Sequence, residues 1–217
     1  MRPEDLAELA ARLEEVYGQP RPETSRPLDE LVRGILSQST TDRQRDQAYR
    51  ALRARFPTGE AVRDAGEEAV AAVIAPAGLA RQKAARIVAV LHELTAPDGR
   101  VDLDDLAGLD TARAYRRLVS LPGVGPKTAA CVLLFSLGRP VFPVDTHVLR
   151  LARRLGLAEK RTGPARVQEQ LTAATPPGLV LSLHVNLILH GRQVCRARRP
   201  RCGACPLAGR CPTSHRS

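Results

Sequence analysis

The residue best placed to do covalent chemistry is a lysine that follows a glycine-rich turn. In the segment LPGVGPKTA, Lys127 comes directly after Pro126, and Gly123 and Gly125 lie just before it. Proline suits the first position of a helix, and the two glycines permit a tight turn with uncovered main chain. A lysine in this position has two interpretations. It is either a surface cation that contacts a phosphate or an amine nucleophile.

The same turn predicts a binding site for an anion. Two helices joined by a Gly-x-Gly turn present several main-chain N–H groups together, and the N-terminal dipole of the second helix points the same way. We therefore expect Gly123, Val124, Gly125 and Thr128 to contact a DNA phosphate. A P-loop is excluded for two reasons. In that motif the last glycine is followed directly by the lysine, whereas here Pro126 stands between Gly125 and Lys127. A P-loop also follows a strand, whereas this turn is expected to follow a helix. The simpler alternative is a turn that only connects two helices.

A carboxylate stands where another helix is expected to begin. Asp145 lies in the segment PVDTH, and an aspartate there is typical of a helix N-cap. A carboxylate can cap a helix and take part in catalysis at once, so the two roles do not exclude each other. His147 falls in the first turn of the same helix. We expect it to pack or to contact a phosphate rather than to transfer a proton.

Four of the five cysteines crowd into the C-terminal segment as Cys-x6-Cys-x2-Cys-x5-Cys, at Cys195, Cys202, Cys205 and Cys211. In a reducing compartment such crowding indicates metal or cluster binding rather than disulfides. Four thiolates suit either a tetrahedral Zn²⁺ ion or a [4Fe–4S] cluster. The long gaps favour the cluster, because its irons lie apart. The remaining cysteine, Cys131, sits in an apolar stretch and is expected to be a small buried hydrophobic residue.

Composition limits the class of partner. The 217 residues include 33 Lys and Arg against 23 Asp and Glu, a net charge of +10 that favours a polyanionic partner. Aromatic residues make up 3%, too few for single-strand binding on rows of stacked rings. No apolar run approaches the roughly 18 residues of a membrane span, and the charged N-terminus lacks a signal core. We therefore expect a soluble, cytoplasmic protein without a membrane partner.

Helical periodicity dominates the elements that must position these residues. Leu103 to Leu109 is less regular, and the run 178–191 fits a strand or a helix, although its length and lack of a pairing partner favour a helix. With no credible set of strands, the sequence predicts an all-α protein. The expected helices cover residues 4–17, 28–36, 42–55, 59–65, 67–75, 80–95, 111–120, 126–136, 145–155 and 163–174.

Taken together, the hairpin LPGVGPKTA, the segment VDTH and the cysteine pattern after HGRQVC resemble the endonuclease III family of helix-hairpin-helix DNA glycosylases. The segments ILSQSTTD and GLARQKA extend the resemblance over residues 28–211. The family fold implies two helical domains flanking a DNA-binding cleft. One is the helix-hairpin-helix domain over residues 24–139. The other, residues 1–23 plus 140–217, holds a C-terminal iron–sulfur cluster loop.

The resemblance also implies a reaction. The protein would be a base-excision repair glycosylase with AP lyase activity that removes oxidised pyrimidines. Lys127 would attack C1′ and form a Schiff base, Asp145 would assist deprotonation and stabilise the cationic transition state, and β-elimination would nick the strand. The partner would be double-stranded DNA with a damaged base or an abasic site, the cofactor a [4Fe–4S] cluster on the four late cysteines, and the protein a nucleoid-associated monomer.

Two residues match the family positions that fill the gap left by an extruded base. They are Gln38, in ILSQSTTD, and Leu79, in GLARQKA, on the opposite side. The simpler alternatives are that Gln38 is a surface amide and that Leu79 is an ordinary loop residue.

Three rival functions are considered. An adenine-excising mismatch glycosylase is disfavoured, because Arg33 stands where such enzymes carry a catalytic glutamate. A non-catalytic DNA-binding cluster protein is disfavoured by the presence of both Lys127 and Asp145. A zinc-binding nucleic-acid module is the third rival.

Overall fold

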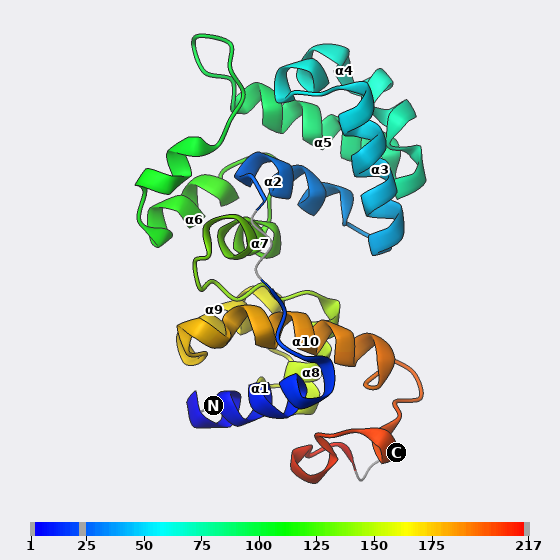
Figure 1. Ribbon diagram of the computed structural model, residues 1–217, viewed down its shortest axis with the longest axis vertical. Coiled ribbons are helices and arrows are strands. Elements are labelled where there is room, and N and C mark those ends of the chain that lie inside the picture. Colours follow the sequence, from blue (N-terminus) through cyan, green and yellow to red (C-terminus); the bar gives the residue numbers. More distant parts are fainter. Residues whose placement is uncertain (1–2, 22–24, 215–217) are drawn as a thin grey trace. The chain divides into compact units, whose positions relative to one another are not determined.

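The computed structural model describes residues 3–21 and 25–214, which form helices and contain no β-strand beyond an isolated bridge between Thr95 and Val101 (Figure 1). The predicted all-α class is confirmed. The α-helices are α1 (Pro3–Tyr17), α2 (Pro27–Leu36), α3 (Asp42–Arg55), α4 (Gly59–Val73), α5 (Ala80–Glu93), α6 (Thr111–Val119), α7 (Pro126–Leu137), α8 (Thr146–Arg154), α9 (Pro164–Ala174) and α10 (Val180–Gln193).

The chain divides into two compact units. The first unit, Glu23–Leu137, contains α2 to α7, and the second, Met1–Pro22 with Gly138–Ser217, contains α1, α8, α9 and α10. The domain boundary expected at residues 23–24 lies outside the described residues. The assignment of DNA-binding and cluster roles to residues 24–139 and to the remainder stays a prediction.

The first unit is held together by α2 packed on α7, with α6 also on α7 and α4 on α5. Gly34 of α2 makes the closest approach, because a Cβ atom at this position would lie 2.8 Å from Cγ2 of Thr128 on α7. A real Cβ atom cannot come that close unless the helices separate or the Thr128 side chain moves. The glycine therefore lets the helix that carries Lys127 lie directly against α2.

Local signals explain where the helices begin and bend. Thr41 forms a capping box with Gln44 and starts α3. Gly66, with φ of 75°, bends α4 at the point between the two predicted helices 59–65 and 67–75. A three-residue 3₁₀ turn, Ala75–Ala77, then leads into α5.

In the second unit, α10 packs against α1 and α8, and α8 also contacts α9. The ambiguous run 178–191 falls in α10 and is a helix. Its pattern resembles a strand because neighbours cover it on more than one side, so that polar residues such as His184, Asn186 and His190 are buried with the apolar ones. An all-round buried helix has no polar stripe to mark its period.

Candidate nucleic-acid interface and cluster site

The hairpin joins α6 to α7 through a turn that uses its two glycines differently. Gly123 adopts a left-handed φ of 73°, as the tight turn requires. Gly125 has no positive φ, and a Cβ atom built on it would meet no described atom within 4 Å. Val124, between them, is buried and donates its N–H to the Leu121 carbonyl at 3.1 Å. The turn therefore presents open main chain at Gly125 and anchors itself through Val124.

Lys127 lies in the first turn of α7, half-buried, with Thr128 beside it packed into α2. A carboxyl group from α2 also faces this part of the helix. Burial raises the pKa of Glu30, and the charge of Lys127 acts in the opposite direction on that pKa. Ser25 donates a hydrogen bond to Glu30 Oε2 at 3.3 Å. The first unit thus supplies an acidic neighbour to Lys127 that the sequence analysis did not select.

Gln38 and Leu79 both lie in the first unit, in turns that end or begin a helix. Arg86 of α5 donates to Gln38 Oε1 through Nη1. The Arg86 side chain also passes beneath the hairpin, 3.1 Å from the place a Gly123 Cβ would occupy. Leu79 is 54% exposed, which is rare for a large apolar side chain here, and has a left-handed φ of 49°. Arg86 therefore connects Gln38 to the hairpin, while Leu79 projects into solvent.

Asp145 is the N-cap of α8, as the sequence predicts. Its Oδ1 accepts the N–H of Val148 at 2.7 Å, so the cap uses one of the two carboxylate oxygens. The approach to it is rigid, because His184 Nδ1 lies 2.9 Å from the Pro143 carbonyl and the 141–144 segment is buried. The N-terminal end of α8 thus fixes the position of the Asp145 carboxylate.

His147 is held by an arginine on the next turn of α8. Arg150 Nη2 lies 3.1 Å from His147 Nδ1 and 2.8 Å from the Gly191 carbonyl, and its Nε donates to the Cys195 carbonyl at 3.1 Å. Because a guanidinium only donates, Nδ1 of His147 must accept, which places the proton of a neutral imidazole on Nε2. Arg150 therefore connects the beginning of α8 to the first of the clustered cysteines.

The four clustered cysteines are free thiols that line a single cavity of about 380 Å³. Among the residues the structure describes, no three His, Cys, Asp or Glu side chains converge closely enough to hold one metal ion. The thiols instead stand around the cavity wall, an arrangement that suits a cluster in which each iron takes one cysteine. These four residues could hold such a group.

Cationic and N–H donors surround these thiols. Arg154 of α8 donates to Cys195 Sγ at 3.2 Å and also to the carbonyls of Arg196 and Ala197 at 2.7 and 3.0 Å. His190 Nε2 lies 3.4 Å from Cys205 Sγ, and Tyr17 Oη lies 3.0 Å from His190 Nδ1. A thiolate accepts from an imidazole N–H, so Tyr17 orients the ring by donating to its other nitrogen. These groups can donate hydrogen bonds to the anionic sulfurs that a cluster requires, while burial raises the pKa of the Cys205 thiol.

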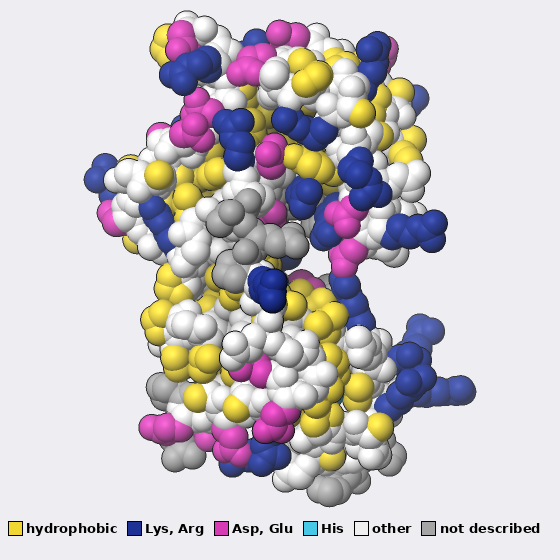
Figure 2. All heavy atoms as spheres, viewed as in Figure 1, with side chains coloured by type: hydrophobic (Ala, Val, Ile, Leu, Met, Phe, Trp, Pro, Cys, Tyr) yellow, Lys and Arg dark blue, Asp and Glu magenta, His cyan; other side chains and the backbone are white. Residues whose placement is uncertain are grey.

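The loop between the first two cysteines carries a group of exposed arginines. Figure 2 shows Lys and Arg side chains projecting together beside the segment that follows α10. No acidic residue lies between Gly191 and the end of the chain, so this segment is uniformly cationic. In the loop between Cys195 and Cys202 the exposed arginines are Arg196, Arg198, Arg199 and Arg201, and Arg192 before it and Arg210 after it are also exposed.

Comparison with known proteins gives two matches to family models. The model of the HhH-GPD superfamily base excision DNA repair protein matches residues 32–177. The model of the iron–sulfur binding domain of endonuclease III matches residues 195–211. Together they cover the hairpin, the Asp145 helix and all four clustered cysteines. No described helix is long and apolar enough to cross a membrane.

Individual relatives give the same result. The endonuclease III of Treponema pallidum is 39% identical over 181 residues, which is 83% of this chain and 81% of that protein. A relative from Arabidopsis thaliana is 37% identical over 165 residues, or 76% of this chain, and the matched part spans 56% of the plant protein.

Two solved structures match over the whole chain. A non-covalent endonuclease III–DNA complex has a TM-score of 0.85 and 26% identity, and covers 100% of this chain and 98% of its own. A trapped covalent endonuclease III–DNA intermediate has a TM-score of 0.84 and 25% identity, with the same coverage.

Proposed function

This chain belongs to the HhH-GPD superfamily of base excision DNA repair proteins, and we propose that it is a DNA glycosylase with AP lyase activity that removes oxidised pyrimidines from duplex DNA. One observation carries the proposal. A lysine stands in the first turn of α7, directly after a Gly-x-Gly turn with open main chain at Gly125, in a chain whose second unit presents a carboxylate at the start of α8. Those groups are the minimum set for Schiff-base chemistry on a sugar.

The reaction begins with extrusion of the damaged nucleotide, because C1′ is not accessible inside the stack. The Lys127 amine, after losing a proton to Asp145, forms a bond to C1′, and the bond from C1′ to the base breaks with its electron pair leaving on the base. The departing base takes up the proton that Asp145 received from Lys127, and the carboxylate, negative again, stabilises the positive charge that develops on the sugar. Opening of the sugar ring then leaves a Schiff base between Lys127 and C1′.

Strand cleavage follows from the same intermediate. The Schiff base acidifies the C2′ proton, and its removal expels the 3′ phosphate as the C3′–O bond breaks. Hydrolysis of the imine frees Lys127 for another turnover. The protonated imine is reducible, so borohydride converts it to a stable amine that links protein to DNA.

The DNA contacts follow from the turns already described. We assign phosphate binding to the main chain around Gly123 and Gly125, and an additional phosphate contact to Nε2 of His147. Val124 and Thr128 have buried side chains, so their part in binding is to hold the turn and the first turn of α7 in place. Gln38 and Leu79 fill the space of the extruded base from opposite sides.

The protein carries a [4Fe–4S] cluster. We assign its ligands to Cys195, Cys202, Cys205 and Cys211, because these thiols line one cavity and Arg154 donates directly to a sulfur. When bound, the cluster supplies a fixed point for the arginine-rich loop that follows Cys195. The chain's own arginines then present positive charge to the DNA backbone.

A single chain contains the hairpin, the lysine, the carboxylate and the cluster loop, so we propose that the protein acts as a monomer on cytoplasmic, nucleoid DNA. Its substrate is duplex DNA with a damaged base or an abasic site.

The test is a panel of duplexes, each with one lesion, scored separately for base release and for strand cleavage. Wild-type protein is expected to release oxidised pyrimidines and to nick the strand. The Lys127→Ala variant is expected to lose both, because the amine is removed. Release of adenine from a mismatch without release of any oxidised pyrimidine would contradict the proposed substrate class.

A further inference from the structure

One buried cation in the first unit takes no part in the function proposed above. Lys83 lies in the first turn of α5 and is 1% exposed, the largest fully buried side chain among the described residues. Burial lowers the pKa of Lys83. Its acceptors are main-chain carbonyls rather than a carboxylate. A buried ammonium is costly and is retained only where its hydrogen bonds are well made.

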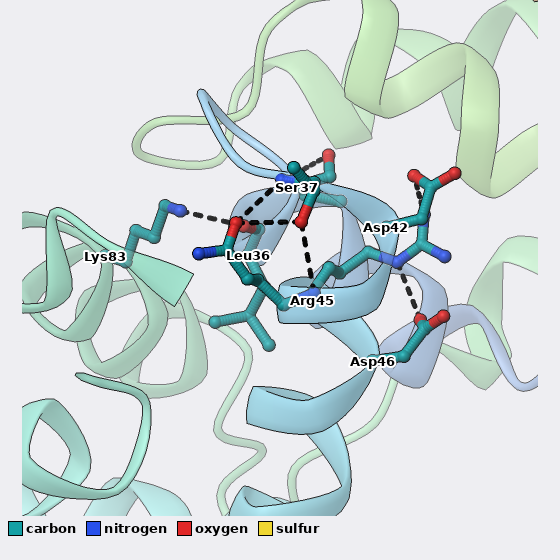
Figure 3. Close-up of polar contacts among 9 residues, drawn as sticks. Leu36, Ser37, Asp42, Arg45, Asp46 and Lys83 are labelled. Carbon is teal, nitrogen blue, oxygen red and sulfur yellow. Dashed lines mark hydrogen bonds and ion pairs between the residues drawn. The ribbon is translucent and has the colours of Figure 1, made fainter. Parts of the chain in front are cut away.

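The two carbonyls belong to different turns. Lys83 Nζ donates to the Leu36 carbonyl at 2.8 Å and to the Ala77 carbonyl at 2.7 Å. Leu36 is the last residue of α2, and Ala77 the last of the 3₁₀ turn before α5. Carbonyls at the C-terminal end of a helix lack partners within the helix and form the negative end of its dipole. One ammonium group therefore satisfies the carbonyls of Leu36 and Ala77 together. Figure 3 shows Lys83 reaching the end of α2 at Leu36.

A third contact joins the same two turns. The Thr40 hydroxyl donates to the Ala77 carbonyl at 2.5 Å. This carbonyl therefore accepts from both Lys83 and Thr40. Hydrogen bonds to the Ala77 carbonyl oxygen therefore connect the turn after α2, residues 37–41, to the turn before α5, residues 75–79.

Each of these turns contains a non-glycine residue in the left-handed region. Ser39 has φ of 53° and Leu79 has φ of 49°, and both are exposed. Such a conformation is unfavourable for a residue with a Cβ atom and persists where the surroundings impose it. Gln38 precedes the first of these residues, and Leu79 is the second. The two turns with left-handed residues are thus the same turns that carry Gln38 and Leu79, the residues proposed to fill the space of the extruded base.

We propose that Lys83 is a positioning residue for base extrusion, which holds the Gln38 and Leu79 turns at a fixed separation so that both enter the duplex together. The inference rests on the proposed function and adds a residue to it. Preorganisation of the two turns removes the cost of ordering them while the base leaves the stack. Loss of Lys83 is therefore expected to slow reaction most where extrusion is hardest.

The experiment compares two substrates in single-turnover base release. In one, an oxidised pyrimidine faces its normal purine partner. In the other, the same lesion faces a tetrahydrofuran abasic analogue, so no pairing resists extrusion. Lys83→Met keeps the length of the side chain and removes the donors. We expect about a tenfold slower reaction on the paired duplex and less than about twofold on the unpaired one.

Two further variants separate this role from simple stabilisation. Val90→Ala lowers packing on the same helix, at a residue that is 1% exposed, without touching either turn. It is expected to affect both substrates equally. Thr40→Val removes only the second link to Ala77, and is expected to change the ratio of the two rates in the same direction as Lys83→Met, by less. If Lys83→Met does not fold, the ratio of the two base-release rates in Thr40→Val tests the proposal in its place.

Equal slowing of both substrates by Lys83→Met and Thr40→Val would overturn the inference and leave Lys83 a stabilising residue. Unchanged rates on both would overturn it as well. Failure of the wild-type protein on the paired duplex would instead overturn the proposed function, so the two failures are distinguishable.

Discussion

At the scale of single residues, Asp145 is the N-cap of α8 and is also the carboxylate to which we assign a catalytic role. Its Oδ1 accepts the Val148 N–H at 2.7 Å, which fixes the side chain without a separate support. A carboxylate oriented in this way loses little conformational entropy when it takes part in a reaction. The structural role and the chemical role of Asp145 can be separated by substitution, because asparagine caps helices as well as aspartate but is a poor base.

We therefore expect Asp145→Asn to leave stability almost unchanged while slowing base release by about 10²- to 10⁴-fold, the range for loss of a general base. Asp145→Ala should show the same loss of activity and, because the cap is removed, a decrease in stability of about 1 kcal/mol. Urea denaturation and single-turnover kinetics measure the two effects. An Asp145→Asn variant with wild-type rates would remove Asp145 from the chemistry.

At the scale of elements, the sequence predicts most helices well, because many of them begin with a local signal, although α5 and α10 start without a capping side chain. The capping box at Thr41, the proline at the start of α7 and the aspartate before α8 are all visible without coordinates. Even the break in α4 at Gly66 follows from its glycine. The helical period of α10 is ambiguous in the sequence because the helix is buried on more than one side, and the irregular stretch from Leu103 to Leu109 is a short 3₁₀ helix, Asp104–Gly108.

The contacts between elements were not predictable in the same way. Lys83 binds carbonyls of residues 36 and 77, and Arg86 binds the side chain of Gln38, so neither interaction leaves a trace in local residue patterns. Glu30 reads as an ordinary first-turn acid of α2, and its closeness to Lys127 emerges only when α2 packs on α7. Tertiary packing, rather than propensity, selects these residues.

The packing of α2 on α7 gives a direct prediction. In Gly34→Ala the new Cβ would lie 2.8 Å from Thr128 Cγ2, so the two helices must separate or Thr128 must move. We expect a loss of about 1 to 3 kcal/mol, the usual cost of overpacking, together with slower Schiff-base formation because Lys127 is the neighbour of Thr128. Thermal unfolding and trapping rates report these two effects.

The double variant Gly34→Ala/Thr128→Ser is the matched control, since serine lacks the methyl group that would clash. It should recover most of the stability and the trapping rate. If the double variant is no better than Gly34→Ala, the contact does not set the position of the lysine helix.

At the scale of the whole molecule, the distribution of charge is expected to govern DNA binding more than any single contact does. Nearly all of the net charge of +10 comes from the second unit, because residues 23–137 hold 16 Lys and Arg against 15 Asp and Glu, while the rest of the chain holds 17 against 8. The arginine-rich loop after Cys195, which has no acidic residue, is part of that excess. The N-terminal helix α1 supports the cysteine segment of its own unit at two points. Glu8 forms an ion pair with Arg210, next to Cys211. Tyr17 contacts His190, which lies 3.4 Å from Cys205 Sγ. One chain thus supplies its own cluster support and its own DNA-binding charge.

Binding to undamaged duplex DNA is accordingly expected to depend strongly on salt, since each phosphate contact releases counterions. For roughly four contacts, the affinity should fall about 100-fold between about 50 and 200 mM salt. Fluorescence anisotropy with a labelled duplex measures the slope. An affinity that is constant over this range would contradict a largely electrostatic interface.

The central claim is that the Lys127 amine forms the covalent bond to the sugar, and borohydride trapping followed by peptide mapping tests it most directly. Wild-type protein is incubated with a duplex that contains an abasic site, reduced with borohydride and digested, and the cross-linked peptide is sequenced by mass spectrometry. The account predicts a single adduct on Lys127 and no adduct in Lys127→Ala. An adduct on another residue, or one that persists in Lys127→Ala, would contradict it.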